Sequence, residues 1–578
     1  MRKATTKRWL IGAAALIVIA IGWGGWLMNS GNNQESSDVA YDGHGGTFKN
    51  TLAEMDTPDP SVVYNDGYYY MTFTHNGADV MVMKSRTIDF KDAQRKTVWY
   101  PDVGTNYSAE LWAPEIQFIQ GKWYIYFAAD DGRNENHRMF ALQADTDDPM
   151  GSYTFKGQIA DDTNKWAIDG LAAEIGGNLY FVWSGWEGDV NVQQNTYIAP
   201  MSDPLTISGP RVLLSEPELD WEKAGGPPYI NEGQSILYHN EDVHIVYSGA
   251  GSWTPYYALG MLTLTKGADP LDPASWTKRE QPLLSMDEEA GVFGPGHNSF
   301  TTSPDGAEQW IVYHATSGPD DGWNNRKARA QKLVWDEAGK LALGKPIGLD
   351  EAIAVPSGTG VFRADPQGAG EASFDLIPVR VNTTAPLLIH YRNASGETLK
   401  GSVSANEGEP IAIELPPADA TGYAYADVPL IAGMNDIRVT ASGGGAVIEA
   451  IELTRYEAEF ARIGPQGEAE ENAFASGGGI VKLAPGEDEG VRFPNVVVPR
   501  KGDYELRIAA SNPSDEPAKL TVRAEEGKTA TLEIPAGERN AFATQSVTLR
   551  LKEGVNALIL EDATAELRID YLDVMTMK

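Results

Sequence analysis

One pattern recurs five times between residues 48 and 365: a turn containing Gly or Asn, then a strand in which aromatic and β-branched residues alternate. The strands are centred on Tyr70, Ile125, Phe181, Ile245 and Ile311, so successive centres lie 55, 56, 64 and 66 residues apart. A period of this size in an all-strand region is typical of a β-propeller in which each repeat forms one four-stranded blade. The sequence therefore predicts an all-β fold with a five-bladed β-propeller over residues 48–365.

A shorter segment with one polar residue near its start precedes each of these strands. The polar residues lie 10–14 positions before the strand centres, and they are Asp59, Glu115, Asp169, Glu232 and His297. This near-constant offset places them at equivalent points of the five blades. If these segments are the innermost strands, the five side chains converge on the propeller axis.

The chain changes character after the propeller. Twelve Trp lie between Trp99 and Trp335 and none lies beyond, and a Gly/Ala/Pro-rich stretch at residues 365–372 is typical of a linker. The sequence around Asn393 then matches that around Asn512 at an offset of 119 residues. We predict two β-sandwich (jelly-roll-like) modules, a truncated one over residues 373–455 and a longer one over 456–578.

The N-terminus predicts export. Four basic residues precede an uncharged apolar run from Trp9 to Met28, which is long enough to span a bilayer, and no clear small-x-small cleavage site follows. Residues 1–30 are therefore predicted to be a signal peptide or, preferably, a signal anchor, with residues 31–47 as a linker. The alternative is a buried N-terminal helix. We expect an extracellular or cell-surface protein that touches the membrane only through this segment.

The composition of the chain excludes several classes of partner and of reaction. The chain has 46 Lys+Arg against 81 Asp+Glu, a formal charge of −35, so we expect no nucleic-acid partner. It has no Cys, which excludes disulfides, thiolate zinc sites, iron–sulfur clusters and cysteine nucleophiles. The reaction must then use carboxylates, His, hydroxyls or a hard cation. We expect the protein to be a monomer.

Four carboxylates among five axial positions are costly, because like charges raise one another's pKa and resist burial. Such a cluster indicates a functional site, and glycoside hydrolysis is the simplest reaction that uses several carboxyl groups together. One carboxylic acid protonates the leaving oxygen, a second carboxylate activates water, and a third keeps the acid protonated by repulsion. The alternative is that these residues cap turns or bind a structural cation.

The segments TPDPSVV, AIDG and NEGQ, together with LWAPE and GPGH, resemble the motifs of glycoside hydrolase family 43 over roughly residues 50–350. The resemblance implies a five-bladed propeller and an inverting enzyme, with no cofactor for the chemistry, that acts on arabinose- or xylose-containing polysaccharides. It also implies Asp59 as general base, Glu232 as general acid, and Asp169 as the carboxylate that tunes and orients the acid.

Further residues are expected to contact the substrate. Trp112 is either an apolar wall for the sugar or a packing residue between blades, and Glu115 either contacts substrate hydroxyls or supports the acid. His297 resembles the family histidine near a central cation or water site, or it is a hydrogen-bonded core histidine. We place Trp183 and Trp186 at the pocket rim, and Arg326 resembles a family arginine that reaches the site from the last blade.

Within the family, the run from INEGQSILYH to IVYSGAGSWTPYYALG and the ending RKARAQKLVWD resemble exo-acting α-L-arabinofuranosidases. This resemblance implies release of terminal α-L-arabinofuranosyl residues from arabinan or arabinoxylan fragments. A β-xylosidase or an endo-arabinanase on the same scaffold is the alternative within enzymes. A non-catalytic cell-surface glycan-binding protein is the alternative of another class.

In the last module, YEAEFARIG and LRIDYLDV resemble carbohydrate-binding modules of families 6 and 35. The resemblance implies a structural Ca²⁺ held by Glu457, Glu459 and Asp570, and oxygen ligands suit such a cation. Neither module has a Trp, so the candidate sugar platforms are tyrosines, namely Tyr391, Tyr423, Tyr425, Tyr504 and Tyr571. The alternative is that one or both modules are spacers or supports for the propeller.

Overall fold

The computed structural model describes residues 47–577, apart from residues 305, 337–338, 352, 365–369, 380, 487–489, 499–500, 525–527 and 553. The predicted export segment and nearly all of the linker after it lie outside these residues. Within the described part of the chain, no helix is both long and apolar enough to cross a bilayer.

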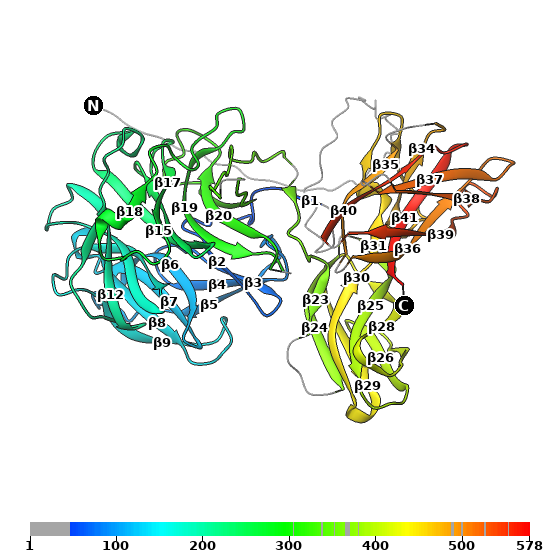
Figure 1. The fold of residues 1–578 in the computed structure, drawn as a ribbon, viewed down its shortest axis with the longest axis horizontal. Coiled ribbons are helices and arrows are strands. Elements are labelled where there is room, and N and C mark those ends of the chain that lie inside the picture. The colour runs from blue at the N-terminus through cyan, green and yellow to red at the C-terminus, as the bar shows by residue number, and fades with distance from the viewer. Residues whose placement is uncertain are drawn as a thin grey trace, which may run out of the picture. The chain divides into compact units, whose positions relative to one another are not determined.

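The propeller is built from antiparallel sheets whose strands run from blue to green in Figure 1. Blade one contains β2 (Ser61–Asn65), β3 (Tyr68–Thr72), β4 (Val80–Ser85) and β5 (Gln94–Trp99). Blade two contains β6 (Ala109–Ile119), β7 (Lys122–Asp130), β8 (Arg138–Ala144) and β9 (Tyr153–Ile159). Blade three contains β10 (Ala167–Ile175), β11 (Asn178–Gly185), β12 (Gln193–Asp203), β13 (Thr206–Ile207) and β14 (Val212–Ser215).

Blade four contains β15 (Tyr229–His239), β16 (Asp242–Gly249), β17 (Ala258–Leu264) and β18 (Trp276–Lys278). Blade five contains β19 (Phe293–Thr302), β20 (Gln309–Thr316) and β21 (Lys327–Lys332). A short parallel pairing between β12 and β15 joins blades three and four. Each predicted aromatic strand is the second strand of its blade, and all five residues of β3 are buried, as expected of a strand covered on both faces.

The two ends of the propeller sequence meet at blade five. The backbone N–H of Leu52 donates to the carbonyl of Ala328, and the Asn50 side chain accepts from the N–H of Ala330 at 2.9 Å. β1 (Thr47–Phe48) also pairs with β22 (Ile353–Ala354). This closure brings the start of blade one beside the last strand of blade five, and so brings Asp59 near Arg326.

The first sandwich pairs two four-stranded sheets around one core. One sheet contains β23 (Val361–Arg363), β30 (Ala446–Leu453), β25 (Thr383–Asn393) and β28 (Ala418–Leu430). The other contains β24 (Glu371–Val379), β29 (Gly433–Ala441), β26 (Leu399–Ala405) and β27 (Ile411–Leu415). Because β23 pairs with β30, the sandwich begins at residue 361, within the range expected for the propeller.

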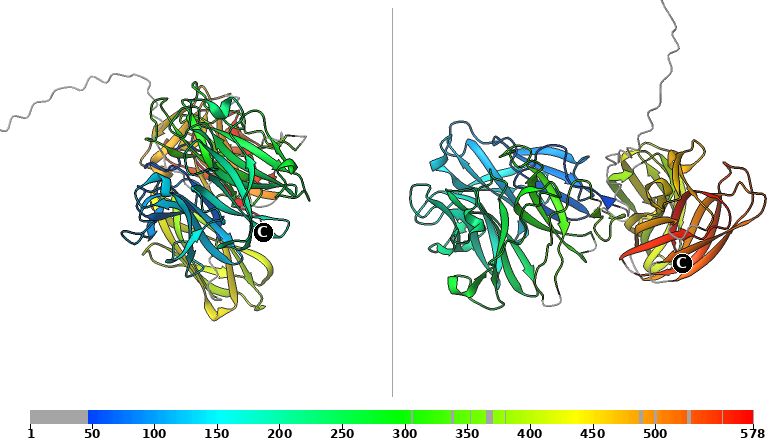
Figure 2. Two further views of the ribbon diagram at one scale, coloured as in Figure 1. Left: turned by 90° about the vertical axis from the view of Figure 1, so that its left-hand side faces the viewer. Right: turned by 90° about the horizontal axis from the view of Figure 1, so that it is seen from above.

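The second sandwich, coloured from orange to red in Figure 2, has the same plan with additional strands near its start. One sheet contains β31 (Arg455–Glu457), β33 (Glu468–Glu471), β34 (Gly479–Leu483), β41 (Leu567–Thr576), β36 (Gly502–Ser511) and β39 (Ala543–Leu551). The other contains β32 (Arg462–Ile463), β35 (Val491–Val498), β40 (Gly554–Glu561), β37 (Ala518–Ala524) and β38 (Thr529–Ile534).

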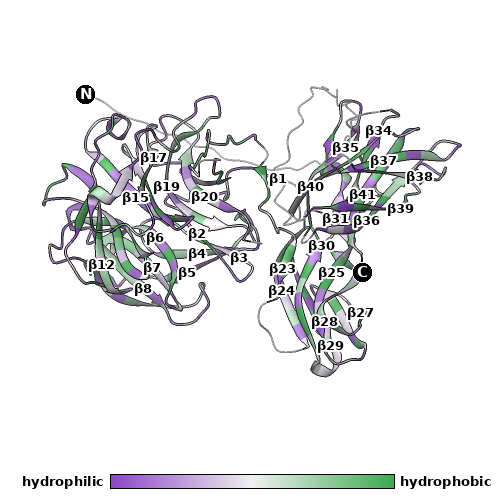
Figure 3. Cartoon of the chain, in the orientation of Figure 1, coloured by the Kyte–Doolittle hydropathy of each residue, from purple (hydrophilic) through white to green (hydrophobic). Residues whose placement is uncertain are grey.

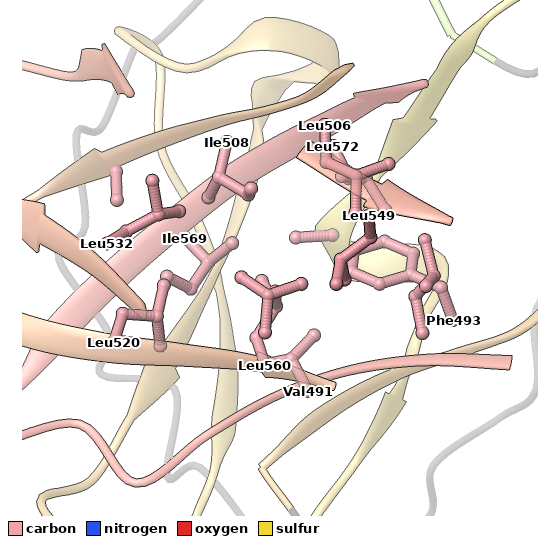
Figure 4. Close-up of a cluster of buried hydrophobic side chains, with 14 of the residues drawn as sticks. Val491, Phe493, Leu506, Ile508, Leu520, Leu532, Leu549, Leu560, Ile569 and Leu572 are labelled. Atoms are coloured by element: carbon pink, nitrogen blue, oxygen red, sulfur yellow. The ribbon is translucent and has the colours of Figure 1, made fainter. Parts of the chain in front are cut away.

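Hydrophobic residues alternate with hydrophilic ones along the sandwich strands (Figure 3), and the inward set fills each core. In the second sandwich Leu506, Leu560 and Ile569 come from both sheets and meet in one cluster (Figure 4). The two sandwiches also share equivalent hydrogen bonds, as expected from their repeated sequence. The Asn393 amide donates to two carbonyls, of Glu397 and Leu415, and the Asn512 amide donates to the corresponding pair.

Regular helix in the described residues is limited to short 3₁₀ turns. They are Asn134–Asn136, Trp221–Lys223, Pro273–Ser275, Ser442–Gly444, Ala458–Phe460 and Ser476–Gly478.

Candidate active site

The inner strands of the propeller break their register where the polar residues occur. The pairing of β10 with β11 shifts between Ile168 and Leu171, and that of β15 with β16 shifts between Glu232 and Ser235. β6 and β19 show shifts at the corresponding places. A bulge of this kind redirects side chains out of the normal pleat, so each of these four blades turns a side chain toward the centre. In blade one the pairing of β2 with β3 has no such shift, and Asp59 lies just before β2.

Each of the five blades has a turn with left-handed backbone conformation at or near its polar residue. The residues with positive φ are Asp59 (57°), Ala113 (44°), Asp169 (54°), Gly233 (62°) and His297 (42°). Positive φ is uncommon outside glycine, so its recurrence identifies the equivalent positions of the five blades. This corrects the predicted alignment in two blades. Glu232 precedes the turn residue by one, and Glu115 follows it by two.

A cavity of about 1330 Å³ opens at one end of the propeller axis. Among its lining residues are Asp59, Trp112, Asp169, Glu232, His297 and Arg326. The three predicted catalytic carboxylates thus share one cavity, and each has less than a tenth of its surface exposed.

Asp59 is held as a carboxylate. Its Oδ2 accepts a 2.7 Å hydrogen bond from the Thr74 hydroxyl, and its Oδ1 accepts one at 3.3 Å from Arg326. Burial alone raises the pKa of this carboxyl group, but Arg326, together with nearby His297, lowers the pKa well below its usual range. His314 Nδ1 accepts a hydrogen bond from the backbone N–H of Asp59 at 3.0 Å, and this contact fixes the turn.

Asp169 and Glu232 have the opposite tendency. Burial, reinforced by neighbouring Asp59, raises the pKa of Asp169 to about 6. Burial, reinforced by Asp169, raises the pKa of Glu232 to about 8. Asp169 Oδ2 accepts a 2.8 Å hydrogen bond from the N–H of Gly233, so it is fixed directly beside the backbone of the acid.

His297 lies between the carboxylates. Its Nε2 is 3.1 Å from Glu115 Oε1, and its Nδ1 is 3.4 Å from Asp59 Oδ1 and 3.9 Å from Asp169 Oδ2. Burial opposes charging of the ring, but Asp169 and Asp59 raise the pKa of His297 to about 10. The imidazolium therefore balances part of the negative charge at the axis.

Of the other predicted contacts, Glu115, Trp183 and Trp186 lie outside the lining of this cavity. Glu115 lines a separate cavity of about 580 Å³, contacts His297, and adds to the negative charge that raises the pKa of Asp169. Trp183 and Trp186 are each 3% exposed and pack within the blade core, Trp183 against Tyr197 and Trp186 stacked on Trp166, so the rim position predicted for them is wrong. Trp112 lines the cavity and stacks on His137 at 4.0 Å between ring centroids.

Three residues that support the catalytic carboxylates were not predicted from the sequence. Tyr257 donates from its hydroxyl to Glu232 Oε1 at 3.0 Å, and His314 anchors the Asp59 turn. Glu222 is fully buried, and its Oε1 accepts from the amide of Asn231, the residue before the acid, at 2.9 Å. Tyr257 lies in the segment SGAGSWTPYY that carried the resemblance, but nothing in its spacing marked it as a contact of Glu232.

In the C-terminal module, Glu457 and Asp570 meet at the turn that begins at Ser476. Ser476 donates its hydroxyl to Glu457 Oε1 at 2.8 Å and its N–H to Asp570 Oδ1 at 2.9 Å. Burial, then the charge of Glu457, raises the pKa of Asp570 to about 8, and Glu459 adds to this effect. Across the described residues, however, no three His, Asp or Glu side chains are grouped so as to hold a metal ion, either here or around His297.

Two of the five candidate sugar platforms are core residues. Tyr391 and Tyr504 are 2% and 1% exposed and belong to the hydrophobic cores of the first and second sandwich. They are therefore unavailable as platforms.

Comparison with known proteins places this geometry in a family. The model for glycosyl hydrolases family 43 matches residues 48–341. The chain belongs to this family. An extracellular exo-α-(1→5)-L-arabinofuranosidase of Streptomyces avermitilis is 38% identical over 311 residues, which cover 52% of this chain and 64% of that protein. A protein of the same description from Streptomyces chartreusis is 33% identical, and the match covers 46% of this chain and 82% of its length.

Among solved structures, an α-L-arabinofuranosidase from Lactobacillus brevis superposes with a TM-score of 0.50 at 33% identity. The match covers 52% of this chain and 98% of that one. The chain spans less than two thirds of the length of the S. avermitilis relative, and the two sandwiches lie outside the family match.

Proposed function

We propose that the protein is an inverting, exo-acting α-L-arabinofuranosidase that removes terminal α-L-arabinofuranosyl residues from arabinan or arabinoxylan fragments. The observation that carries this proposal is the separation of two pKa values in one cavity. Near neutral pH Asp59 is ionised, whereas Glu232, with a pKa of about 8, is mostly protonated. The same site thus offers a base and an acid together, as inverting hydrolysis requires.

In the proposed reaction, Glu232 donates its proton to the glycosidic oxygen as the bond to the sugar breaks. Asp59 accepts a proton from the water that attacks the anomeric carbon from the opposite face. Asp169 keeps Glu232 protonated through its negative charge and holds the backbone of Gly233. No cofactor takes part in these steps, and each acid or base group contributes roughly 10²–10⁴-fold to the rate.

The relatives support the choice of sugar and of exo action. The two Streptomyces proteins are named as exo-arabinofuranosidases, and the Lactobacillus brevis protein as an α-L-arabinofuranosidase. A β-xylosidase or an endo-arabinanase on the same scaffold is the competing possibility, because those activities use the same carboxylates.

The purified protein should be incubated with α-1,5-linked arabino-oligosaccharides, and the products followed by size and by proton NMR. Release of single arabinose units, first seen with inverted anomeric configuration, is the expected result. Xylose release from xylobiose, or oligomers from debranched arabinan, would select a competing activity. Full activity in Asp59→Asn or Glu232→Gln would overturn the assigned roles.

We propose further that the protein is exported by residues 1–30 and acts outside the cell as a monomer. The basic and apolar N-terminal sequence supports export, and the Streptomyces relatives are named extracellular. Antibody detection in washed cells and culture medium would separate an anchored protein from a secreted one. Light scattering would give the oligomeric state.

For the C-terminal module we propose a structural Ca²⁺ near Glu457, Glu459 and Asp570. Its support is the crowding of these carboxylates and the buried Glu457 Oε2, which has no hydrogen-bond partner. A hard cation would relieve this repulsion. An increase in melting temperature on adding Ca²⁺, lost in Asp570→Asn, is the expected result, and no shift in the parent protein would contradict the proposal.

A groove on the second sandwich favours glycan binding as an additional function. Phe474, 73% exposed, lies there with Asn472, Asn540 and Arg568. Arg568 is only 3% exposed, and its Nη1 lies 3.1 Å from Glu470 Oε2, which also lines the groove. An exposed ring beside amide groups suits a sugar. Retardation in arabinan-containing gels should be lost in Phe474→Ala and kept in Phe118→Ala, a propeller variant that removes a 54% exposed ring.

A further inference from the structure

Two tryptophans lie together at the mouth of the catalytic cavity. Trp253 and Trp323, 36% and 61% exposed, both line it, and their rings meet edge to face with centroids 5.8 Å apart. We call this pair the tryptophan corner. Among the tryptophans that the structure describes, these two alone are strongly exposed, and they occur at one place. Large exposed aromatic surface gathered at one point is typical of a binding site.

The corner is held in place without a ligand. Trp323 donates its Nε1–H to the Ser252 hydroxyl at 3.2 Å, which ties the loop of blade five to that of blade four. The Trp253 loop is closed by a 2.9 Å hydrogen bond from the N–H of Thr254 to the carbonyl of Gly251. The rings are therefore preorganised, which lowers the entropy lost when a ligand stacks on them.

The two loops also hold the proposed catalytic groups. The loop of Trp253 continues to Tyr257, whose hydroxyl contacts Glu232. The carbonyl of Trp323 accepts from Arg326 Nε at 3.3 Å, and Arg326 contacts Asp59. Because Glu232 protonates the glycosidic oxygen, the departing part of the substrate leaves past the acid, and the corner is attached to the loop that holds this acid.

The size and charge of the cavity restrict the ligand. Its volume of about 1330 Å³ exceeds the roughly 300–1,000 Å³ of common small-molecule pockets, so it has room for more than one sugar. Asp56, Glu110 and Asp130 line it in addition to the catalytic carboxylates. This negative lining disfavours uronic acids and other anionic sugars.

We infer that the tryptophan corner binds the second sugar of the substrate, the unit from which the terminal arabinofuranose is cleaved, and that this unit belongs to a neutral oligosaccharide. The apolar C–H face of that sugar stacks on an indole ring. The inference rests on the proposed glycosidase function. It makes the enzyme selective for oligosaccharides over simple glycosides.

The test compares kcat/KM for α-1,5-linked arabinotriose with that for methyl α-L-arabinofuranoside, whose methyl group is too small to cover an indole ring. In Trp253→Ala and Trp323→Ala the ratio of the two values should fall by about 3–10-fold, as for the loss of one aromatic contact. Trp253→Phe and Trp323→Phe keep a ring and should retain most of the ratio. Tyr100→Ala removes a 67% exposed ring outside the cavity and should leave both values unchanged.

An unchanged ratio in both alanine variants would overturn the inference. Equal losses on the two substrates would also overturn it, because they indicate a structural role for the rings. A loss in the phenylalanine variants as large as in the alanine variants would contradict stacking. If the parent enzyme cleaves neither substrate, the proposed function itself fails, and this result is distinct from the other three.

Discussion

At the residue scale, the assignment of acid and base depends on different surroundings for chemically similar groups. Asp59 has Arg326 and a hydroxyl donor beside it, whereas Glu232 has a buried carboxylate as its main charged neighbour. Glu232 must be protonated to act, so activity should disappear as pH rises through its pKa of about 8. Asp59 must be ionised, and because its pKa is lowered well below its usual range, it should remain ionised in mildly acidic solution and not limit activity there.

This reasoning makes Asp169 a determinant of the alkaline limit. Asp169→Asn removes the charge that raises the pKa of Glu232, so the alkaline limb of the kcat/KM profile should move to lower pH. The magnitude of kcat should fall as well, because the contact with Gly233 changes. Asp162→Asn, an exposed change in the loop that leads into β10, is the control. An alkaline limb that stays in place in Asp169→Asn would rule out the electrostatic role.

Glu222 provides a second test at the residue scale. Its carboxylate accepts hydrogen bonds from Asn231, Tyr247 and two backbone N–H groups, and Lys278 Nζ lies 2.8 Å from it. Removing one partner of a buried ion pair typically costs about 3–5 kcal/mol. Glu222→Gln should therefore lower the free energy of unfolding by about 3 kcal/mol in urea titrations and reduce kcat by displacing Glu232. Glu218→Gln, in the same loop but exposed, should change neither quantity.

At the element scale, the catalytic geometry depends on the five left-handed turns at the start of the inner strands. Gly233 has φ of 62°, and a Cβ there would lie 3.1 Å from His297 Cα. Gly233→Ala should cost about 1–2 kcal/mol in strain and shift Glu232, so kcat should fall. Ala113→Gly is the matched change, because it gives glycine to the equivalent turn and should increase stability by up to about 1 kcal/mol with little effect on kcat. Equal kcat values in Gly233→Ala and the parent protein would contradict this view of the turn.

These turns also explain which parts of the fold and of the site could be predicted from the sequence. The 55–66-residue period predicted the blades, because each blade repeats one strand–turn pattern and buries it in the same way. Three of the five residues that it placed at equivalent points of the blades, Asp59, Asp169 and His297, do occupy equivalent left-handed turns. It aligned Glu115 and Glu232 by chemistry rather than by backbone, since a bulge shifts side chains by one or two positions without leaving a sequence signal.

Contacts between segments that are far apart along the chain could not be predicted from the sequence. Tyr257 and Glu232 lie 25 residues apart and meet when the strands of blade four pair. Arg326 and Asp59 lie 267 residues apart and meet only where blade five closes on blade one. Trp183 and Trp186 were wrongly predicted to contact the substrate. Tryptophan suits both sugar stacking and core packing, and the alternation along β11 does not reveal which side of the blade faces the cavity.

At the scale of the whole molecule, the catalytic cavity lies within the part that matches the family, whereas the proposed calcium site lies in the last sandwich. This separation makes their responses to pH distinguishable. Asp570 has a pKa of about 8 in the folded protein, above its ordinary value of 3.8. A carboxyl group with a raised pKa stabilises the fold most below its ordinary pKa, and this stability is lost as pH rises toward the raised value.

Without Ca²⁺, the second sandwich should therefore become less stable as pH rises from about 4 to 8, because Asp570 must ionise next to Glu457. Bound Ca²⁺ should reverse this trend, since it binds the ionised carboxylates and is favoured at high pH. Calorimetry of the full chain at pH 5 and pH 8, with EDTA or Ca²⁺, measures both effects, and Asp570→Asn identifies the transition that belongs to this module. If the calcium-induced increase in melting temperature is not larger at pH 8 than at pH 5, the carboxylates do not hold the ion. Catalysis should be unaffected in Asp570→Asn at temperatures below that transition, because Asp59 and Glu232 lie in a separate fold.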